Sequence, residues 1–301
     1  MRKMTAFHSM NDMELLCIFT PTYERAFCLP NLFESLKQQK ALNFRWLIVD
    51  DGSTDNTEEV VESFMAASPF PIEYIKQENG GKQRAHNTGV AHCENELFFC
   101  VDSDDVLPPH VTEEIERQWS DAASDRRIAG LVGLCGGRDG KPLGTSMPKG
   151  VSTLTFWDLY YKYGHKGDSA PIYRTEILKQ FPFDVEPGEK FIAEPYVYHQ
   201  IDQHYCLRVV DKILMTREYL SDGYTSNVRK VTKENPIGYK KLKLMYIRYS
   251  DTLYLQFYNS ILYQVGCILS NTKHGSAASP HRFVTALAWL PAYILVKTVY
   301  R

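Results

Sequence analysis

Residues 47–59 read LIVDDGSTDNTEE, and residues 97–105 read LFFCVDSDD. In both stretches a short apolar run, of the length of a buried strand, ends in closely spaced acidic residues. Like charges side by side at the tip of a buried strand are costly unless an opposite charge or a bound ligand stabilises them. The two stretches therefore predict strands whose carboxyl ends form part of a binding site.

Apolar runs and helical patterns alternate through the first 120 residues. Strands are predicted at Glu14–Thr20, Phe44–Val49, Ile72–Ile75 and Leu97–Val101. Helical spacing or helix-start signals follow each of them, at residues 29–36, 55–64, 82–92 and 109–119. This alternation is typical of βαβ units, so we expect an α/β fold with a mostly parallel sheet and helices on both faces. In such sheets ligands bind outside the carboxyl ends of the strands.

The second half is less regular. Residues 130–150 are rich in glycine and predict a loop or short hairpin, and strands are predicted at Leu207–Val210 and Ile213–Tyr219. We expect a first domain over residues 1–222, divided into halves at 1–120 and 121–222. A mainly helical C-terminal region follows at 223–301.

Composition excludes several classes of protein. The chain has 301 residues, 44% hydrophobic and 23% charged, with a net charge of −2, so no basic field indicates a nucleic-acid partner. The seven cysteines are scattered and no CxxC occurs, which argues against a disulfide framework or a zinc site. The first 14 residues lack the apolar core of a signal peptide. We expect a cytoplasmic protein.

The C-terminal stretch Phe283–Val296 is apolar but is interrupted by Pro291. It is shorter than the roughly 20 residues that a spanning helix needs. We expect a buried closing helix. The alternative is a helix in the membrane interface, supported by the basic residues between Asn227 and Arg248, at the inner face of the cell membrane.

Three polar clusters follow the predicted strands. Asp102 and Asp104 are separated by one residue, so on an extended chain they point the same way and can hold Mg²⁺ or Mn²⁺; the alternative is a polar turn. Asp51 can accept a hydrogen bond from a nucleobase or ribose, or it can cap the following turn. Residues 79–84, NGGKQR, form a glycine-rich turn before a helix, which favours an anion.

Four motifs in this order resemble the family 2 glycosyltransferases with the GT-A fold. They are TPTYERAFCLPNLFESL, LIVDDGSTDNTEEV, NGGKQRAHNTGV and FFCVDSDDVLPP, within the first 120 residues. The resemblance implies a Rossmann-like GT-A domain, a nucleoside diphosphate sugar as donor, usually uridine-linked, and a divalent metal ion. It also implies a set of donor-binding residues, namely Thr20, Pro21, Tyr23, Asp51, Lys82, Asn87 and Asp102.

The same resemblance assigns Asp102 and Asp104 to the DxD motif, with Asp104 holding the metal. The base that deprotonates the acceptor usually lies in a Glu-Asp pair, and here that place reads Ala193-Glu194-Pro195. Glu194 is therefore the candidate base. The missing Asp leaves four rival carboxylates, which are Glu189, Asp184, Asp202 and Asp168.

The implied function is inverting transfer of a sugar to a hydroxyl of a glycan or lipid-linked acceptor in cell-surface polysaccharide synthesis. The altered Glu-Asp pair keeps open a catalytically silent member that binds a nucleotide sugar or a protein partner. A nucleotidyltransferase is a third alternative, but that class is expected to carry a Gly-rich, basic loop after the first strand, where this chain has TPTYER.

Overall fold

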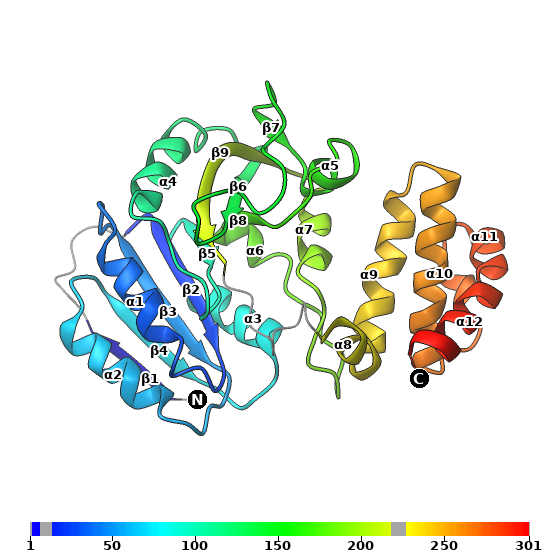
Figure 1. The fold of residues 1–301 in the computed structure, drawn as a ribbon, viewed down its shortest axis with the longest axis horizontal. Coiled ribbons are helices and arrows are strands. Elements are labelled where there is room, and N and C mark those ends of the chain that lie inside the picture. The colour runs from blue at the N-terminus through cyan, green and yellow to red at the C-terminus, as the bar shows by residue number, and fades with distance from the viewer. Residues whose placement is uncertain (1, 7–13, 218–226, 301) are drawn as a thin grey trace. The chain divides into compact units, whose positions relative to one another are not determined.

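The computed structural model describes residues 2–6, 14–217 and 227–300 (Figure 1). The chain forms two compact units. One contains Met1–Pro182 with His199–Tyr219, and the other contains Phe183–Tyr198 with Leu220–Arg301. Residues 183–198, which include Glu194, thus belong with the C-terminal helices.

The first unit is built on one sheet. Its elements are β1 Arg2–Ala6, β2 Leu16–Thr22, α1 Leu29–Lys37, β3 Phe44–Asp50, α2 Thr57–Ala67, β4 Ile72–Lys76, α3 Lys82–His92, β5 Leu97–Cys100, α4 Val111–Ser120, β6 Ile128–Gly136, β7 Thr153–Leu154, α5 Phe156–Tyr161, β8 Ser169–Arg174, α6 Thr175–Leu178 and β9 Cys206–Thr216. Among the described residues, nine strands pair in the order β1-β4-β3-β2-β5-β8-β6-β9-β7. The predicted strands and helices of the first 120 residues are confirmed to within a few residues.

The sheet is more mixed than the sequence predicts. Strands β4, β3, β2 and β5 are parallel, as expected for βαβ units. Strand β8 then runs antiparallel to both β5 and β6, and the edge strands β1 and β7 are antiparallel to their neighbours. Strands β6 and β9 are parallel, so the second half is mixed, and the prediction of a mostly parallel sheet holds fully only for the first half of the domain.

Helices cover both faces of the parallel strands. Trp46 lies beside Ile18 in the register, so the two side chains share one face of the sheet. Phe19 is the next residue of β2, so its side chain points to the opposite face. Phe33 of α1 stacks against Trp46, whereas the ring of His86 in α3 meets Phe19 edge-on. Figure 1 shows α1 and α2 across the front of these strands. The buried strands are near-continuous apolar runs because both faces are covered.

The glycine-rich segment 130–150 begins as a strand, so the predicted loop is wrong up to Gly136, whereas residues 137–150 form turns and loop as predicted. Strand β6 is buried along its length and lies between β8 and β9. A Cβ at Gly130 would lie 1.9 Å from the carbonyl oxygen of Ile172, and one at Gly133 would lie 2.4 Å from Leu214. Glycine here allows close approach of the neighbouring strands rather than a turn. The two strands predicted at 207–219 form the single strand β9 up to Thr216, and residues 218 and 219 lie outside the described residues.

The second unit is helical. Helix α7, Pro195–Ile201, begins in it and ends in the first unit, and α8 Val228–Glu234, α9 Pro236–Tyr249, α10 Leu253–Leu269, the short 3₁₀ helix η2 Gly275–Ala278, α11 Arg282–Leu287 and α12 Trp289–Val299 follow. Arg282–Val299 is long and apolar enough to cross a membrane by length and composition, with a mean hydropathy of 1.3. Only 17% of that window is buried, so the prediction of a buried closing helix is wrong.

Candidate active site

The carboxyl ends of β2, β3 and β5 lie side by side, because these strands are parallel neighbours. Thr20–Arg25 follows or ends β2, Asp50 and Asp51 end β3, and Asp102–Asp105 follow β5. The structure thus brings the polar strand tips to one edge of the sheet, where open α/β sheets bind ligands.

Asp51 fixes the glycine-rich turn that precedes α3. Its Oδ1 accepts hydrogen bonds from Gln77 Nε2 at 2.7 Å and from the Gly80 amide at 3.0 Å. Its Oδ2 accepts from the Gly81 amide at 2.6 Å and from Asn79 Nδ2 at 3.2 Å. The residue is only 3% exposed, and two bonds per oxygen use the acceptor capacity of a carboxylate. A nucleoside that binds Asp51 must displace Gln77 or Asn79.

Gly52 lets this turn approach β3 closely. Its φ of +86° is in the left-handed region, and a Cβ there would lie 2.9 Å from the Asn79 amide nitrogen. The turn after β3 is thereby held against the turn before α3. Asp51 and Gly52 together set where α3 begins.

Lys82 connects the start of α3 to the end of β5. Its Nζ lies 2.7 Å from Asp102 Oδ1 and 2.8 Å from Oδ2. Both side chains are largely buried, with 20% and 27% of their surface exposed. Burial opposes ionisation of Asp102, but Lys82 and Arg217 outweigh it and hold the pKa of Asp102 below its ordinary value. A continuous set of contacts therefore runs from Asp51 through Gly81 and Lys82 to Asp102.

Arg217 joins the acidic segment from β9. The bonds between Val106 and Thr216, 3.0 and 2.8 Å long, tie the end of β9 to the segment after β5. Arg217 lies 3.1 Å from Asp168 and 3.8 Å from Asp105. Burial and the charge of Asp102 raise the pKa of Asp105, while Arg217 acts against them.

Asp104 is the open carboxylate of the segment. No other residue in the described part of the chain donates a hydrogen bond to its side chain. Burial and the neighbouring charge of Asp102 raise the pKa of Asp104. Arg25 and Lys82 lower it by smaller amounts, so the cations of the described residues do not offset the burial.

The donor set fits a hard divalent ion in part. Carboxylate oxygens suit Mg²⁺ or Mn²⁺, and Mg²⁺ usually needs only one or two of them when substrate phosphates complete its shell. Asp104 is available, whereas Asp102 is shared with Lys82. The described residues contain no group of three His, Cys, Asp or Glu side chains that would hold a metal alone.

The predicted base-pocket residues differ in exposure. Thr20 is fully buried, and its hydroxyl accepts a 2.9 Å hydrogen bond from Trp46 Nε1, so its side chain belongs to the core. Pro21 is buried as well, whereas Tyr23 is 49% exposed and is accessible to a ligand. Asn87 lies half-buried in the second turn of α3.

Glu194 lies in the second unit, directly before α7. Its carbonyl accepts hydrogen bonds from the amides of Val197 and Tyr198, so it occupies the start of that helix. It is half-buried.

The rival carboxylates have structural partners. Glu189 accepts 2.7 Å bonds from the amides of Ile237 and Gly238 at the start of α9. Asp202 accepts 2.8 Å bonds from the first two amides of α5 and lies 3.0 Å from His199. Asp184 pairs with Lys241 on the surface, and Asp168 pairs with Arg217. Two of the four rivals thus cap helices.

Three residues at this edge escape the sequence argument. Arg217 lies inside the strand predicted at Ile213–Tyr219, but the observed strand β9 ends at Thr216, so Arg217 stands directly after a strand end that the sequence argument placed too late. Gln77 supports Asp51 and accepts a 2.6 Å bond from Thr88. Gln83, in the first turn of α3, is 1% exposed, and neither amide atom has a hydrogen-bond partner in the described residues. Nothing in the sequence marks Gln83.

Comparison with known proteins identifies the family. The model of the family described as glycosyl transferase family 2 matches residues 17–180, which is more than half of the chain. The chain belongs to glycosyl transferase family 2. The predicted family resemblance is therefore confirmed.

Relatives within family 2 match mainly the first half. The glycosyltransferase GlyG of Streptococcus pneumoniae is 32% identical over 113 residues, covering 37% of each chain. Poly(ribitol-phosphate) beta-N-acetylglucosaminyltransferase TarS of Staphylococcus aureus is 25% identical over 181 residues, covering 57% of this chain and 30% of TarS. The match thus spans only about a third of these curated relatives.

Solved structures share the fold over almost the whole chain. S. aureus TarS 1–349 in complex with UDP-GlcNAc has a TM-score of 0.60 at 19% identity, covering 95% of this chain and 91% of TarS 1–349. The mannosyltransferase PcManGT from Pyrobaculum calidifontis, in complex with GDP-Man and Mn²⁺, has a TM-score of 0.56 at 17% identity. The GT-A fold predicted from the sequence is confirmed by this likeness.

Proposed function

We propose that the chain is an inverting, metal-dependent glycosyltransferase. It moves a sugar from a uridine diphosphate sugar to a hydroxyl of a glycan or lipid-linked acceptor. We place it in cell-surface polysaccharide synthesis, in the cytoplasm at the inner face of the cell membrane.

One observation carries this proposal. The contacts from Asp51 through Gly81 and Lys82 to Asp102 join the tips of β3 and β5 to the start of α3. They align the N-terminus of a helix, a lysine and the open carboxylate of Asp104 at one sheet edge. A helix N-terminus and a lysine suit a diphosphate, and a carboxylate suits the cation that accompanies it.

The comparisons support the donor class and the setting. UDP-GlcNAc is bound in a structure of TarS 1–349, and GDP-Man with Mn²⁺ is bound in PcManGT. TarS is named for transfer of N-acetylglucosamine to poly(ribitol-phosphate), and a hyaluronan synthase and chondroitin synthases are also among the relatives. These relatives differ in the donor and acceptor that their names give.

The roles of the residues follow from charge. Lys82 and the amides at the start of α3 bind the diphosphate, and Asp51 keeps the turn in place. Tyr23 and Asn87 flank the nucleoside. Asp104, with Asp102, would hold Mg²⁺ or Mn²⁺, which neutralises charge on the departing diphosphate when bound.

Glu194 is the proposed base. It takes the proton of the acceptor hydroxyl, whose oxygen attacks the anomeric carbon from the side opposite the leaving diphosphate. The bond to the diphosphate breaks as the new glycosidic bond forms, so the configuration inverts. The hydroxyl must come within about 3 Å of the carboxylate.

The proposal is tested by release of nucleoside diphosphate from a panel of nucleotide sugars, with Mn²⁺ and with chelator. We expect slow hydrolysis of one donor, lost with chelator and in Asp104→Asn. Glu194→Gln should abolish transfer to an acceptor and leave donor binding unchanged. Asp121→Asn, on the exposed end of α4, is the matched control.

Donor binding, measured in the same panel, separates the alternatives. Metal-dependent binding of one donor, with no transfer to any glycan or lipid-linked hydroxyl, would favour a silent nucleotide-sugar-binding protein. Absence of both binding and hydrolysis would refute the assignment of this edge as a donor site.

A further inference from the structure

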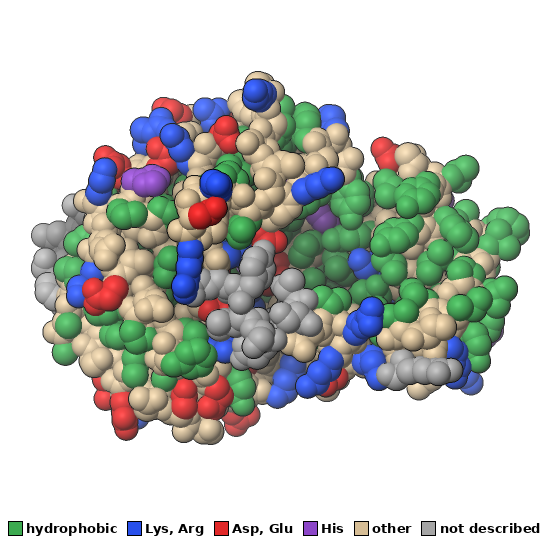
Figure 2. All heavy atoms as spheres, viewed as in Figure 1, with side chains coloured by type: hydrophobic (Ala, Val, Ile, Leu, Met, Phe, Trp, Pro, Cys, Tyr) green, Lys and Arg blue, Asp and Glu red, His purple; other side chains and the backbone are tan. Residues whose placement is uncertain are grey.

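The C-terminal helices expose apolar side chains at helical spacing. On α10 these are Leu253, Tyr254, Phe257 and Tyr258, on α11 Phe283 and Leu287, and on α12 Trp289, Leu290, Tyr293 and Ile294. Within each helix the spacing of one and four residues places them on one side. Figure 2 shows hydrophobic side chains over most of the visible surface of α10–α12. We call these ten residues the apolar face.

Helices α11 and α12 are part of the folded unit. Thr285 is fully buried, and its hydroxyl lies 3.0 Å from Ser260 and 2.7 Å from Ser279. Its carbonyl accepts a 2.9 Å hydrogen bond from Gln264 Nε2. Ala288 and Ala292 are also fully buried. Removing this segment from α10 would leave buried polar groups unpaired, so the apolar face is presented by a fixed scaffold.

The geometry favours a bilayer surface over a bilayer span. The segment is broken at Ala288 into α11, with 6 residues, and α12, with 11 residues. At 1.5 Å per residue α12 is about 16 Å long, roughly half the hydrocarbon thickness of a membrane. Pro291 lies in the first turn of α12, where its missing amide hydrogen is tolerated.

Charge distinguishes the two surfaces that could cover the apolar face, an anionic membrane and a second copy of the chain. Residues 236–301 contain eight lysine and arginine residues and one acidic residue, Asp251; of the eight, Lys241 is paired with Asp184 and Glu186 of the same unit. An anionic surface complements this excess, whereas a second copy would bring the same positive charge against it. Tyrosine and tryptophan, which supply four of the ten residues of the apolar face, suit the boundary between headgroups and acyl chains.

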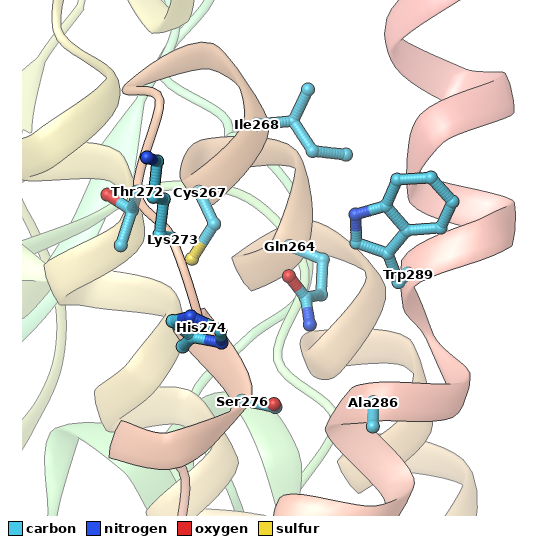
Figure 3. Close-up of a pocket in the computed structure, with 10 residues that line it drawn as sticks. Gln264, Cys267, Ile268, Thr272, Lys273, His274, Ser276, Ala286 and Trp289 are labelled. Carbon is cyan, nitrogen blue, oxygen red and sulfur yellow. The ribbon is translucent and has the colours of Figure 1, made fainter.

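A pocket beside the apolar face has a mixed lining, with apolar side chains next to a lysine, a histidine and hydroxyl groups. It has a volume of about 470 Å³ and lies between α10, the η2 segment and the start of α12. Lys273, His274, Thr272 and Ser276 line it, and Trp289 belongs to both the pocket and the apolar face (Figure 3). A phospholipid carries its phosphate next to its acyl chains. Hydroxyl and cationic groups beside an apolar face can therefore contact the phosphate while the apolar face contacts the acyl chains.

We propose that the apolar face docks on an anionic phospholipid bilayer, with α10–α12 lying in the interface and the Lys273 pocket facing headgroup phosphates. The face contains none of the residues of the strand edge. Docking therefore stands whether or not the chain transfers sugar.

The test is flotation of the full chain with vesicles. We expect binding to vesicles of phosphatidylcholine and phosphatidylglycerol, and at least about tenfold weaker binding to phosphatidylcholine alone, because each basic residue near an anionic surface contributes. The double variant Phe283→Ser, Leu290→Ser should weaken binding to the anionic vesicles by at least about tenfold through loss of apolar burial. Both positions are at least 60% exposed, so the fold should tolerate the change.

The matched control is Phe27→Ser, a 67% exposed phenylalanine of the first unit, which should leave vesicle binding unchanged. The variant Lys273→Gln, Arg282→Gln should lose the preference for phosphatidylglycerol while keeping its thermal melting temperature. Light scattering of the chain without vesicles tests whether a second copy of the chain covers the apolar face instead. A dimer that Phe283→Ser, Leu290→Ser dissociates, or equal flotation of that variant and the wild type, would overturn the proposal.

Discussion

Replacing Asp51 by Asn should destabilise the first unit, because each carboxylate oxygen faces one side-chain donor and one backbone amide. In the wild type the Gly80 nitrogen lies 3.0 Å from Asp51 Oδ1 and the Gly81 nitrogen lies 2.6 Å from Asp51 Oδ2. The NH₂ group of the new side chain replaces one of these two oxygens, so in either orientation it faces one of the two backbone N–H groups. Gln77 or Asn79 can rotate away, but the backbone amide cannot. The variant loses one charge-assisted hydrogen bond and leaves one backbone amide unsatisfied, at a position where Asp51 is only 3% exposed. Together these changes should lower the unfolding free energy by about 2–4 kcal/mol.

Urea unfolding followed by circular dichroism measures this loss, and calorimetric titration with UDP measures the donor site in the same protein. The control Asp121→Asn should change the unfolding free energy by less than about 0.5 kcal/mol. Both stability and UDP affinity should fall in Asp51→Asn, since the turn before α3 loosens. A variant of normal stability that no longer binds UDP would refute this reasoning and would indicate that Asp51 contacts the nucleoside directly.

Two further changes test the packing around α3. Lys82→Met should cost about 1–3 kcal/mol of unfolding free energy at pH 7, against less than about 0.5 for the exposed Lys37→Met. Burial opposes ionisation of Asp102, but Lys82 holds the pKa of Asp102 below its ordinary value of 3.8. The contribution of Lys82 to the unfolding free energy is therefore present above pH 3.8 and should vanish as the pH falls below it. Denaturation at a series of pH values measures this loss. Gly89→Ala would place a Cβ 2.4 Å from the Phe19 ring and should lower the melting temperature, at a cost of about 1–3 kcal/mol, whereas unchanged melting would show that α3 can move.

The sequence predicts the first half of the fold because local and tertiary signals agree there. Helix α3 runs from Lys82 to His92, as predicted, and the glycine-rich turn with Gly80 and Gly81 directly precedes it. The second half fails where tertiary packing overrides local preference. Glycine predicts turns, but in β6 it is required by the closeness of β8 and β9, which no local pattern records.

Hydrogen bonding explains the limits at the candidate site. The sequence places Asp51 at a strand tip, but its four donors come from residues 26–30 positions further along the chain. Likewise Glu189 and Asp202 were rival bases in the sequence, and only the structure shows the amides that they cap, in α9 and α5. Which acidic residue is structural depends on partners that spacing does not reveal.

Most of the acidic residues at the strand tips have hydrogen-bond or cationic partners among the described residues. Asp50 accepts bonds from the Ser53 amide and the Tyr74 hydroxyl, Asp51 binds the turn before α3, Asp102 pairs with Lys82, and Asp105 lies near Arg217. Asp104 has no such partner within the described residues. Burial and Asp102 keep the pKa of Asp105 raised despite Arg217, and the residue that the DxD pattern assigns to the metal, Asp104, has the least support of the set. A cation bound there would stabilise the fold as well as the donor, so Mn²⁺ should raise the melting temperature of the wild type and not that of Asp104→Asn.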